Sequence, residues 1–238
     1  MSNTWFQFKQ FRIEQKRTAQ KVGTDGVLLG AWSIVHGVNR ILDVGTGTGL
    51  VALMLAQRSD AVITAIEIDE NAYEEASSNF EKSPWAERLQ ILYGDFNQFN
   101  NLNNQFYDLI VCNPPYFKNS MKSADAASTL ARHDVSLSFL QLIRGSRGLL
   151  TDHGKMAVIV PFEATIDFRE TARMEGFYLN RQTNIIPRTG KPAKRVLLEF
   201  SLSREYPIVN ELVILDERNK YSEEFTELTR DFYLNVQS

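Results

Sequence analysis

The sequence predicts an α/β fold with a mostly parallel sheet, helices between its strands and an antiparallel hairpin at one edge. Two observations predict it. Short apolar runs rich in β-branched residues alternate with longer amphipathic segments along the 238 residues, as strands alternate with crossover helices in such folds. The first of these strands also runs directly into a glycine-rich turn and a helix. We expect a single domain over residues 1–238.

The sheet is expected to contain seven strands. Their segments are 40–44, 61–67, 89–93, 107–112, 155–160, 177–186 and 196–203. The last two form the edge hairpin across the loop 187–195. One helix is expected to begin near Val27, and a second to run from the glycine turn to about Arg58. Further helices are expected over 70–81 with Asp69 as N-cap, over 136–149, after the strand 155–160 as far as Arg173, and over 221–234. An Asn-rich loop is expected at 97–106 and a turn at 152–154.

Composition excludes several classes of protein. With 43% hydrophobic and 23% charged residues the chain is typical of a globular protein. No apolar run is long enough to span a bilayer, and the first residues lack the basic-then-apolar layout of a signal peptide, so we expect a cytoplasmic location and no membrane partner. Cys112 is the single cysteine, which excludes an internal disulfide, and no His/Cys cluster has the spacing of a metal site.

The net charge of −3 lowers the expectation of a nucleic-acid-binding protein, yet the charge is unevenly distributed. Basic residues gather in residues 1–22, against Glu14 alone, and in the loop before the last expected strand. They are Lys9, Arg12, Lys16, Arg17 and Lys21 in the first group, and Arg188, Lys191, Lys194 and Arg195 in the second. A basic face and scattered solvated charge both remain open.

The glycine-rich turn has the pattern D-x-G-x-G-x-G, with Asp43 inside the strand and glycines at Gly45, Gly47 and Gly49. Bare backbone in such a turn can press against a cofactor. A dinucleotide fingerprint has the different spacing G-x-G-x-x-G. An acid at position 43 would repel a pyrophosphate but can hold an ammonium group, directly or through water. These features disfavour a nicotinamide-dependent dehydrogenase.

Polar residues also stand at the ends of the next two strands. Glu67 lies about twenty residues past the glycines, where a carboxylate commonly grips a ribose diol. Asp95 and Phe96 follow the third strand and suit an adenine ring, although Gly-Asp is also an ordinary turn. Upstream, Thr24 and Asp25 lie between two glycines, where they either approach a ligand or cap the following helix.

The fourth strand ends in Asn113-Pro114-Pro115-Tyr116. The two prolines withhold backbone N–H groups and keep the exit from the strand extended. The Asn113 side-chain oxygen and the Pro114 carbonyl can then accept both hydrogens of one planar –NH2 group, while Tyr116 offers a stacking face. An ordinary turn is the alternative. Residues 117–135 are expected to form a lid or substrate loop, and we assign His133 no chemistry.

Taken together, these motifs resemble the Rossmann-like (class I) S-adenosylmethionine-dependent methyltransferases. The Asn-Pro-Pro-Tyr version resembles the members that methylate planar nitrogens, chiefly the exocyclic amine of adenine. Residues 9–11, 21–32 and 228–234 look like the bacterial tRNA(Val) (adenine-37-N(6))-methyltransferase family.

The resemblance implies a cofactor, S-adenosyl-L-methionine, and a catalytic set, Asn113, Pro114 and Tyr116. The methionine moiety would meet Thr24 and Asp43, the ribose Glu67, and the adenine Asp95 and Phe96. The three glycines and Asn113 would also bind the cofactor. It also implies tRNA as the partner, with residues 1–32 as an N-terminal extension that contributes to cofactor and RNA binding. The RNA-contacting residues would be the two basic groups above together with Lys118 and Lys122.

Three other interpretations remain. The acceptor is another planar amine, of rRNA, DNA or a protein glutamine; or the chain is a nicotinamide-dependent dehydrogenase; or it is a non-enzymatic RNA-binding module. Cytosine C5 methylation is not expected, because it needs an attacking thiol and Cys112 precedes Asn113 inside the strand. No metal and no protein partner are assigned.

Overall fold

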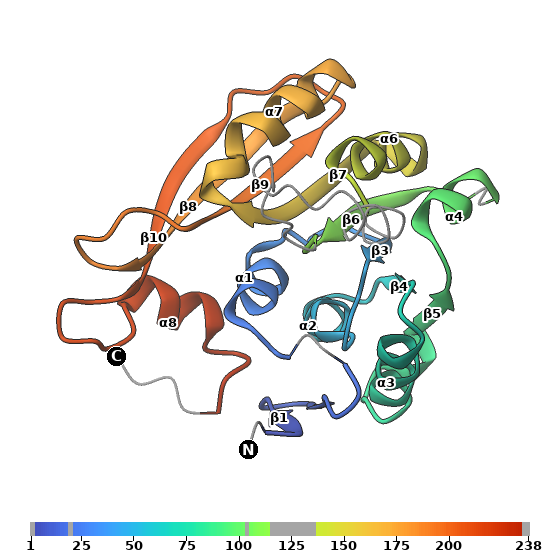
Figure 1. Cartoon of the computed structure of the whole chain (residues 1–238), viewed down its shortest axis with the longest axis horizontal. Coiled ribbons are helices and arrows are strands. Elements are labelled where there is room, and N and C mark those ends of the chain that lie inside the picture. The colour runs from blue at the N-terminus through green and yellow to red at the C-terminus, as the bar shows by residue number, and fades with distance from the viewer. Residues whose placement is uncertain (1–2, 19–20, 103–104, 115–136, 235–238) are drawn as a thin grey trace, which may run out of the picture.

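The computed structural model describes residues 3–18, 21–102, 105–114 and 137–234, and this part of the chain forms an eight-stranded sheet covered by helices on both faces (Figure 1). The strand order is β10-β8-β9-β7-β6-β3-β4-β5. Within this sheet only β9 runs antiparallel to its neighbours. The strands are β3 (Arg40–Val44), β4 (Val62–Glu67), β5 (Leu89–Tyr93), β6 (Tyr107–Cys112), β7 (Leu150–Pro161), β8 (Tyr178–Arg188), β9 (Arg195–Ser201) and β10 (Ile208–Leu215). The expected α/β class with a mostly parallel sheet is confirmed.

The strand count and the edge differ from the expectation. The β8–β9 hairpin exists, but β10 pairs parallel with β8 and takes the edge position beyond it. The sheet therefore has eight strands, and the antiparallel strand lies inside it. The signal for β10 was present in the apolar, β-branched run from Ile208 to Leu215.

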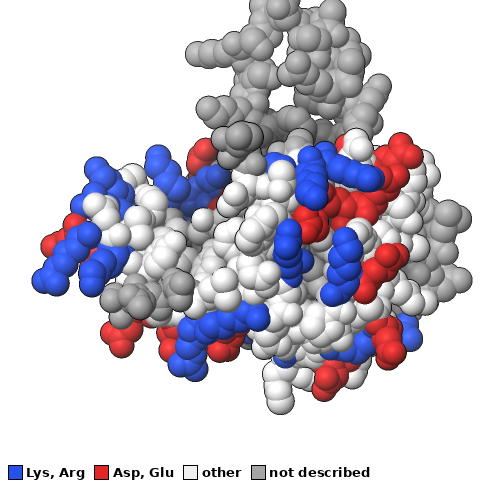
Figure 2. Space-filling view, turned by 90° about the horizontal axis from the view of Figure 1, so that it is seen from below, with Lys and Arg blue, Asp and Glu red and all other residues white. Residues whose placement is uncertain are grey.

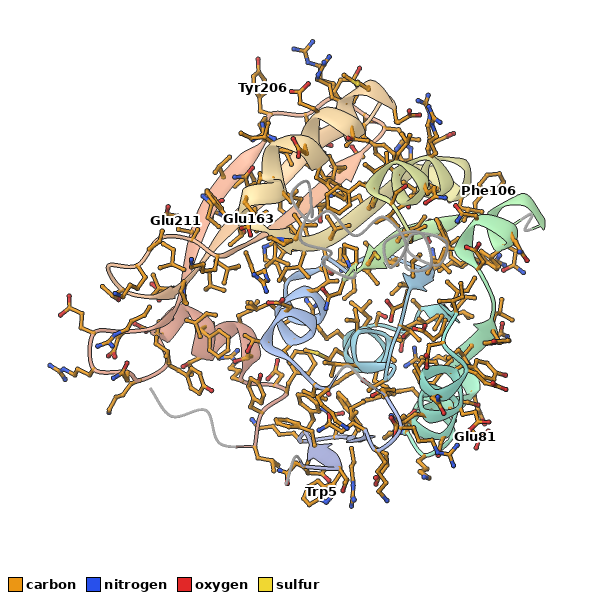
Figure 3. All side chains as sticks on the ribbon, viewed as in Figure 1. Trp5, Glu81, Phe106, Glu163, Tyr206 and Glu211 are labelled. Atoms are coloured by element: carbon orange, nitrogen blue, oxygen red, sulfur yellow. The ribbon has the colours of Figure 1, made fainter. Side chains whose placement is uncertain are left out.

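Two helical layers enclose the sheet. Along β6, Leu109 and Val111 belong to the core on one face, and Ile110 and Cys112 to the core on the other, as the alternation of side chains in a strand requires. Side chains fill the space between sheet and helices on both faces (Figure 3). The first face is covered by α1 (Thr24–Trp32), α2 (Leu50–Arg58), α3 (Glu70–Glu81) and α8 (Glu223–Thr229), and the second by α4 (Phe96–Leu102), α6 (Phe139–Leu149) and α7 (Thr165–Met174). Short 3-10 helices are η1 (Ala86–Arg88) and η2 (Phe162–Ala164).

Three local expectations are corrected. Helix α4 occupies residues 97–102 of the expected Asn-rich loop, because the Asp95 carbonyl accepts from Gln98 and Phe99 N–H groups and starts the helix. The expected turn at 152–154 lies inside β7, where the register with β6 shifts. Helix α1 begins at Thr24, three residues before Val27.

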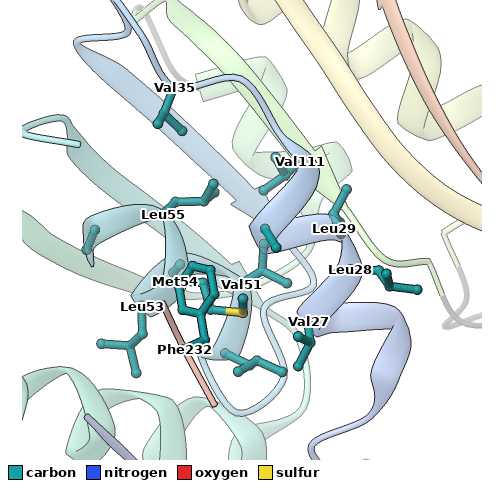
Figure 4. Packing of buried hydrophobic residues seen from close by; sticks show 14 of the residues in the cluster. Val27, Leu28, Leu29, Val35, Val51, Leu53, Met54, Leu55, Val111 and Phe232 are labelled. Atoms are coloured by element: carbon teal, nitrogen blue, oxygen red, sulfur yellow. The ribbon is translucent and has the colours of Figure 1, made fainter. Parts of the chain in front are cut away.

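The two ends of the chain pack together on the first layer. Strands β1 (Trp5–Gln7) and β2 (Arg12–Glu14) form an antiparallel hairpin, and the Lys9 N–H donates to the Phe232 carbonyl at 2.8 Å. The Phe232 side chain joins the cluster formed by α1 and α2 (Figure 4). The expected C-terminal helix is present as α8. Among the described residues no helix combines the length and apolar character needed to cross a membrane.

Candidate functional site

The carboxyl ends of the central strands lie level with one another. Cys112 of β6 pairs with Val44 of β3, and Val44 pairs with Ile66 of β4. One position further along, the three neighbouring residues are Gly45 after β3, Glu67 at the end of β4 and Asn113 after β6. The structure thus brings the glycine turn, the second-strand carboxylate and the start of the Asn-Pro-Pro-Tyr segment to one edge of the sheet, where open α/β folds bind ligands.

Asp43 is buried, 1% exposed, beneath the glycine turn. Its Oδ2 accepts a hydrogen bond from the Thr46 hydroxyl at 2.6 Å and another from the Ala52 N–H at 3.2 Å. The pKa of Asp43 is raised from 3.8 to about 7, mainly by burial and to a smaller extent by the charge of Glu67, against the lowering effect of the two hydrogen bonds. Asp43 therefore links the glycine turn to the start of α2. A cation placed nearby would favour the charged form of its carboxyl.

The turn depends on its glycines. Gly45, Gly47 and Gly49 have φ of +70°, +59° and +82°, a region that favours glycine. A Cβ on Gly49 would lie 2.5 Å from Phe80 Cε1, whereas around Gly45 and Gly47 nothing lies within 4 Å of the Cβ position. Gly49 therefore serves packing on α3, and the other two present open backbone at the carboxyl edge of the sheet.

Glu67 is bound by backbone N–H groups of two segments. Its Oε2 accepts from Gly47 at 2.8 Å, and its Oε1 accepts from Ile68 and Asp69 at 2.9 Å each. The Glu67 carbonyl also accepts from the Gly94 N–H at 2.8 Å, which joins the ends of β4 and β5. This carboxylate fixes the glycine turn against β4.

Asp95 and Phe96 follow β5 and lead into α4. Asp95 is half-buried, and its Oδ1 accepts from the backbone and side-chain N–H groups of Asn97. Phe96 is 4% exposed and packs so closely on α6 that a Cβ on Gly145 would lie 2.4 Å from its ring. The ring is therefore part of the core between α4 and α6, and its expected stacking on an adenine stays a prediction.

Asn113 is half-buried and Pro114 is buried directly beyond β6. Cys112, the residue before them, is buried, and burial raises the pKa of its thiol, with the charges of Asp43 and Glu67 adding to the effect. The thiol therefore stays protonated, in keeping with the expectation that it is no nucleophile. The expected loop 117–135 lies outside the described residues, and so do Tyr116, Lys118, Lys122 and His133.

Thr24 is exposed at the first turn of α1, and its neighbour Asp25 pairs with Arg195 at 2.8 Å. Arg195 opens β9 opposite Pro161, the last residue of β7. The basic loop 188–195 therefore lies at the same end of the sheet as the glycine turn. Lys191 and Lys194 are exposed there, and Arg188 donates to the Glu217 carbonyl at 2.7 Å.

The N-terminal cations all make contacts within the protein, and those of Lys9 and Arg17 reach beyond the N-terminal segment. Arg12 pairs with Glu14 and stacks over Trp5, 4.3 Å from the ring centre. Acidic and basic side chains are interspersed over the face shown in Figure 2. The remaining contacts are Lys9 with the Arg230 carbonyl, Lys16 with Glu14, Arg17 with Glu74 and Lys21 with the Gln15 carbonyl.

Two buried polar residues of α3 were missed in the sequence. Glu75 and Asn79 are 5% and 2% exposed and bind the N-terminal segment and the glycine turn. Their partners are backbone groups distant in sequence, so no local motif marks them. Arg218 and Lys220, exposed beside the basic loop, were missed because they follow the unassigned β10. Among the described residues no group of three or more His, Cys, Asp or Glu side chains is placed to hold a metal ion.

Comparison with known proteins gives consistent matches. The family model for the methyltransferase small domain matches residues 28–164. A tRNA1(Val) (adenine(37)-N6)-methyltransferase of Bacteroides fragilis is 45% identical over 237 residues, covering 99% of this chain and all of the relative. Among solved structures, a predicted O-methyltransferase of Agrobacterium tumefaciens superposes with a TM-score of 0.70 at 19% identity, covering 90% of this chain and 100% of the other. A glycopeptide N-methyltransferase in complex with S-adenosyl-L-methionine gives 0.54 at 14% identity, covering 77% and 100%.

Proposed function

Because the chain belongs to the methyltransferase small domain family, we propose that it transfers a methyl group from S-adenosyl-L-methionine to the exocyclic N6 amine of an adenine in tRNA, namely adenine-37 of the valine tRNA anticodon loop. The full-length relatives at 43–46% identity bear that activity in their names. The observation that carries the proposal is the position of Asn113, which leaves β6 level with the glycine turn after β3.

The carboxyl edge of the sheet fits the cofactor. Gly45 and Gly47 offer backbone with no atom near their Cβ positions, and Asp43 lies beneath them with a carboxyl that an ammonium would return to its charged form. Asp43, the glycines, Thr24 and Asn113 would hold the methionine moiety, Glu67 the ribose, and Asp95 and Phe96 the adenine. The cofactor supplies an activated sulfonium methyl group.

Asn113 and Pro114 would prepare the acceptor. The lone pair of the adenine amine is delocalised into the ring, so the amine is a weak nucleophile. If the Asn113 side-chain oxygen and the Pro114 carbonyl accept its two hydrogens, they favour a pyramidal nitrogen with its lone pair free for in-line transfer, a task of positioning more than of basicity. Tyr116 would stack on the base, and an anticodon loop presents such a base already single-stranded.

The basic groups would hold the RNA backbone. Lys191 and Lys194 are exposed at the carboxyl edge of the sheet, and the Asp25–Arg195 pair fixes their loop next to α1. We assign phosphate contacts to this loop, to the N-terminal cations and to Lys118 and Lys122. Residues 1–32 would be an extension of a single domain, since Phe8 and Ile13 share a core with α1 and α2. The proposed location is the cytoplasm, where tRNA is modified.

The test is transfer of a labelled methyl group to bulk tRNA, rRNA, DNA and protein, each with and without ribonuclease, followed by nucleoside mapping. The proposal predicts label in N6-methyladenosine at position 37 of valine tRNA that ribonuclease removes. Label that survives ribonuclease and co-migrates with protein would instead identify a glutamine methyltransferase.

A further inference from the structure

Helix α3 touches both arms of the proposed cofactor site through one face. The first arm is the glycine turn between β3 and α2. Asn79 Nδ2 donates to the Thr48 carbonyl of this turn at 2.9 Å, and Phe80 closes on Gly49. Two residues of α3 therefore contact the glycine turn directly.

The second arm is the N-terminal segment that leads to Thr24. Asn79 makes two further hydrogen bonds, accepting from the Glu14 N–H at 2.9 Å and donating to the Glu14 carbonyl at 3.0 Å. A single buried carboxamide thus binds both arms. Three of its hydrogen-bonding groups are used within the protein, which leaves it little rotational freedom.

Glu75, one turn earlier on α3, binds the same segment through successive backbone N–H groups. Its carboxylate accepts from Lys16, from Arg17 at 3.1 and 3.2 Å, and from Thr18 at 3.0 Å. Charge-assisted hydrogen bonds of this kind are about twice as strong as neutral ones. The carboxylate therefore fixes a stretch of backbone that forms neither helix nor strand.

Gln15 connects the same segment to the residues that precede α1. Its side-chain oxygen accepts from the Val22 N–H at 2.7 Å, and its side-chain nitrogen donates to the Asn3 carbonyl at 3.0 Å. Val22 is two residues from Thr24. Hydrogen bonds from α3 thus hold residues 14 and 16–18, and Gln15 within this stretch binds Val22, two residues before α1.

We propose that Asn79 and Glu75 are positioning residues for the cofactor, because they hold the glycine turn and the segment leading to Thr24 at a fixed spacing. The inference rests on the proposed cofactor site. Neither side chain needs to touch the cofactor. Loss of either would leave the fold in place but widen the distribution of distances between the two arms, and cofactor affinity would fall.

The test is the affinity of the full chain for S-adenosyl-L-homocysteine, measured by titration calorimetry well below the unfolding temperature. Asn79→Ala leaves three backbone groups without their partner, and we expect Kd to rise on the order of tenfold. Asn79→Asp keeps an acceptor for Glu14 but cannot donate to Thr48, and should weaken binding similarly. Glu75→Gln should also raise Kd, because its –NH2 opposes the backbone donors.

Matched controls separate positioning from general loss of stability. Asn180→Ala removes another buried asparagine, which donates to Glu205 at 2.9 Å near the start of β8, and Glu81→Gln changes an exposed glutamate at the end of α3. Both should leave Kd within about twofold of the wild type. In turnover, the α3 variants should raise KM for S-adenosyl-L-methionine more than they lower kcat at saturating cofactor.

Equal Kd values for the α3 variants and their controls would overturn the inference while leaving the proposed function standing. A wild-type chain that binds S-adenosyl-L-homocysteine but whose affinity is unchanged in Asn79→Asp would remove the role of the Thr48 contact. A wild-type chain that binds no S-adenosyl-L-homocysteine would overturn the cofactor site itself, and the inference with it.

Discussion

The Thr46 hydroxyl donates a 2.6 Å hydrogen bond to the Asp43 carboxyl beneath the glycine turn, and Oδ2 of the same carboxyl accepts from the Ala52 N–H. One buried acid thus joins the end of β3, the turn and α2. Because the group is buried, its charged form is costly and its pKa is raised to about 7. The acid that organises the turn is therefore poised to change charge near neutral pH.

Asp43 should make stability depend on pH. Between about pH 4 and pH 7 the folded chain keeps a proton on this carboxyl that the unfolded chain has released, so its contribution to stability is full below that window and is lost as pH rises through about 7. Relative to Asp43→Asn, the wild type should lose up to about 1.4 kcal/mol of unfolding free energy per pH unit in the window. Urea unfolding of both chains at a series of pH values measures this; parallel stability curves would contradict the raised pKa.

The approach of Phe80 to Gly49 should make this glycine hard to replace. Gly49→Ala introduces a Cβ 2.5 Å from the ring at a φ of +82°. We expect a loss of about 2–4 kcal/mol, from the left-handed backbone and from overpacking. Gly37→Ala is the control, because its φ is +74° with nothing within 4 Å of the Cβ position, and should cost about 1–2 kcal/mol. Equal losses of unfolding free energy in the two variants, measured by denaturant unfolding, would show that the Phe80 ring moves aside at little cost.

The exposed cations of the β8–β9 loop should set the salt dependence of RNA binding. Removing one cation that binds a phosphate makes the slope of log K against log salt shallower by about 0.7–0.9. Lys191→Ala combined with Lys194→Ala should therefore flatten the slope for tRNA by about 1.5 and weaken binding at low salt. Lys82→Ala, an exposed lysine at the end of α3, should change neither. An unchanged slope in the double variant would show that the RNA backbone binds at another face of the protein.

The carboxyl-edge motifs could be predicted from sequence because each is local. Glycines at 45, 47 and 49 and acids at strand ends are recognisable from a few neighbouring positions in the sequence, and the parallel sheet brings them together. Asp69 as the α3 cap was equally readable and is confirmed, since its side chain accepts from the Ala72 N–H at 2.8 Å.

The features that could not be predicted from the sequence depend on contacts between residues far apart in the chain. The burial of Phe96 follows from Gly145 on α6, and the roles of Glu75 and Asn79 follow from backbone groups about sixty residues earlier. The ion pairs of Arg17 with Glu74 and of Arg195 with Asp25 likewise turn residues expected to face RNA partly toward the protein. No local pattern encodes such contacts.

The role proposed for Asn113 is to accept one of the two amine hydrogens of the target adenine at the exit of β6, beside the Pro114 carbonyl. It is tested most directly by the single-turnover rate of methyl transfer to tRNA with saturating S-adenosyl-L-methionine, compared between the wild type and Asn113→Ala. Saturation removes any effect of the substitution on cofactor affinity. We predict a rate lowered by about 10²–10³, the usual consequence of losing one aligned hydrogen-bonding group at a reacting centre. A rate within a few-fold of the wild type would contradict the account.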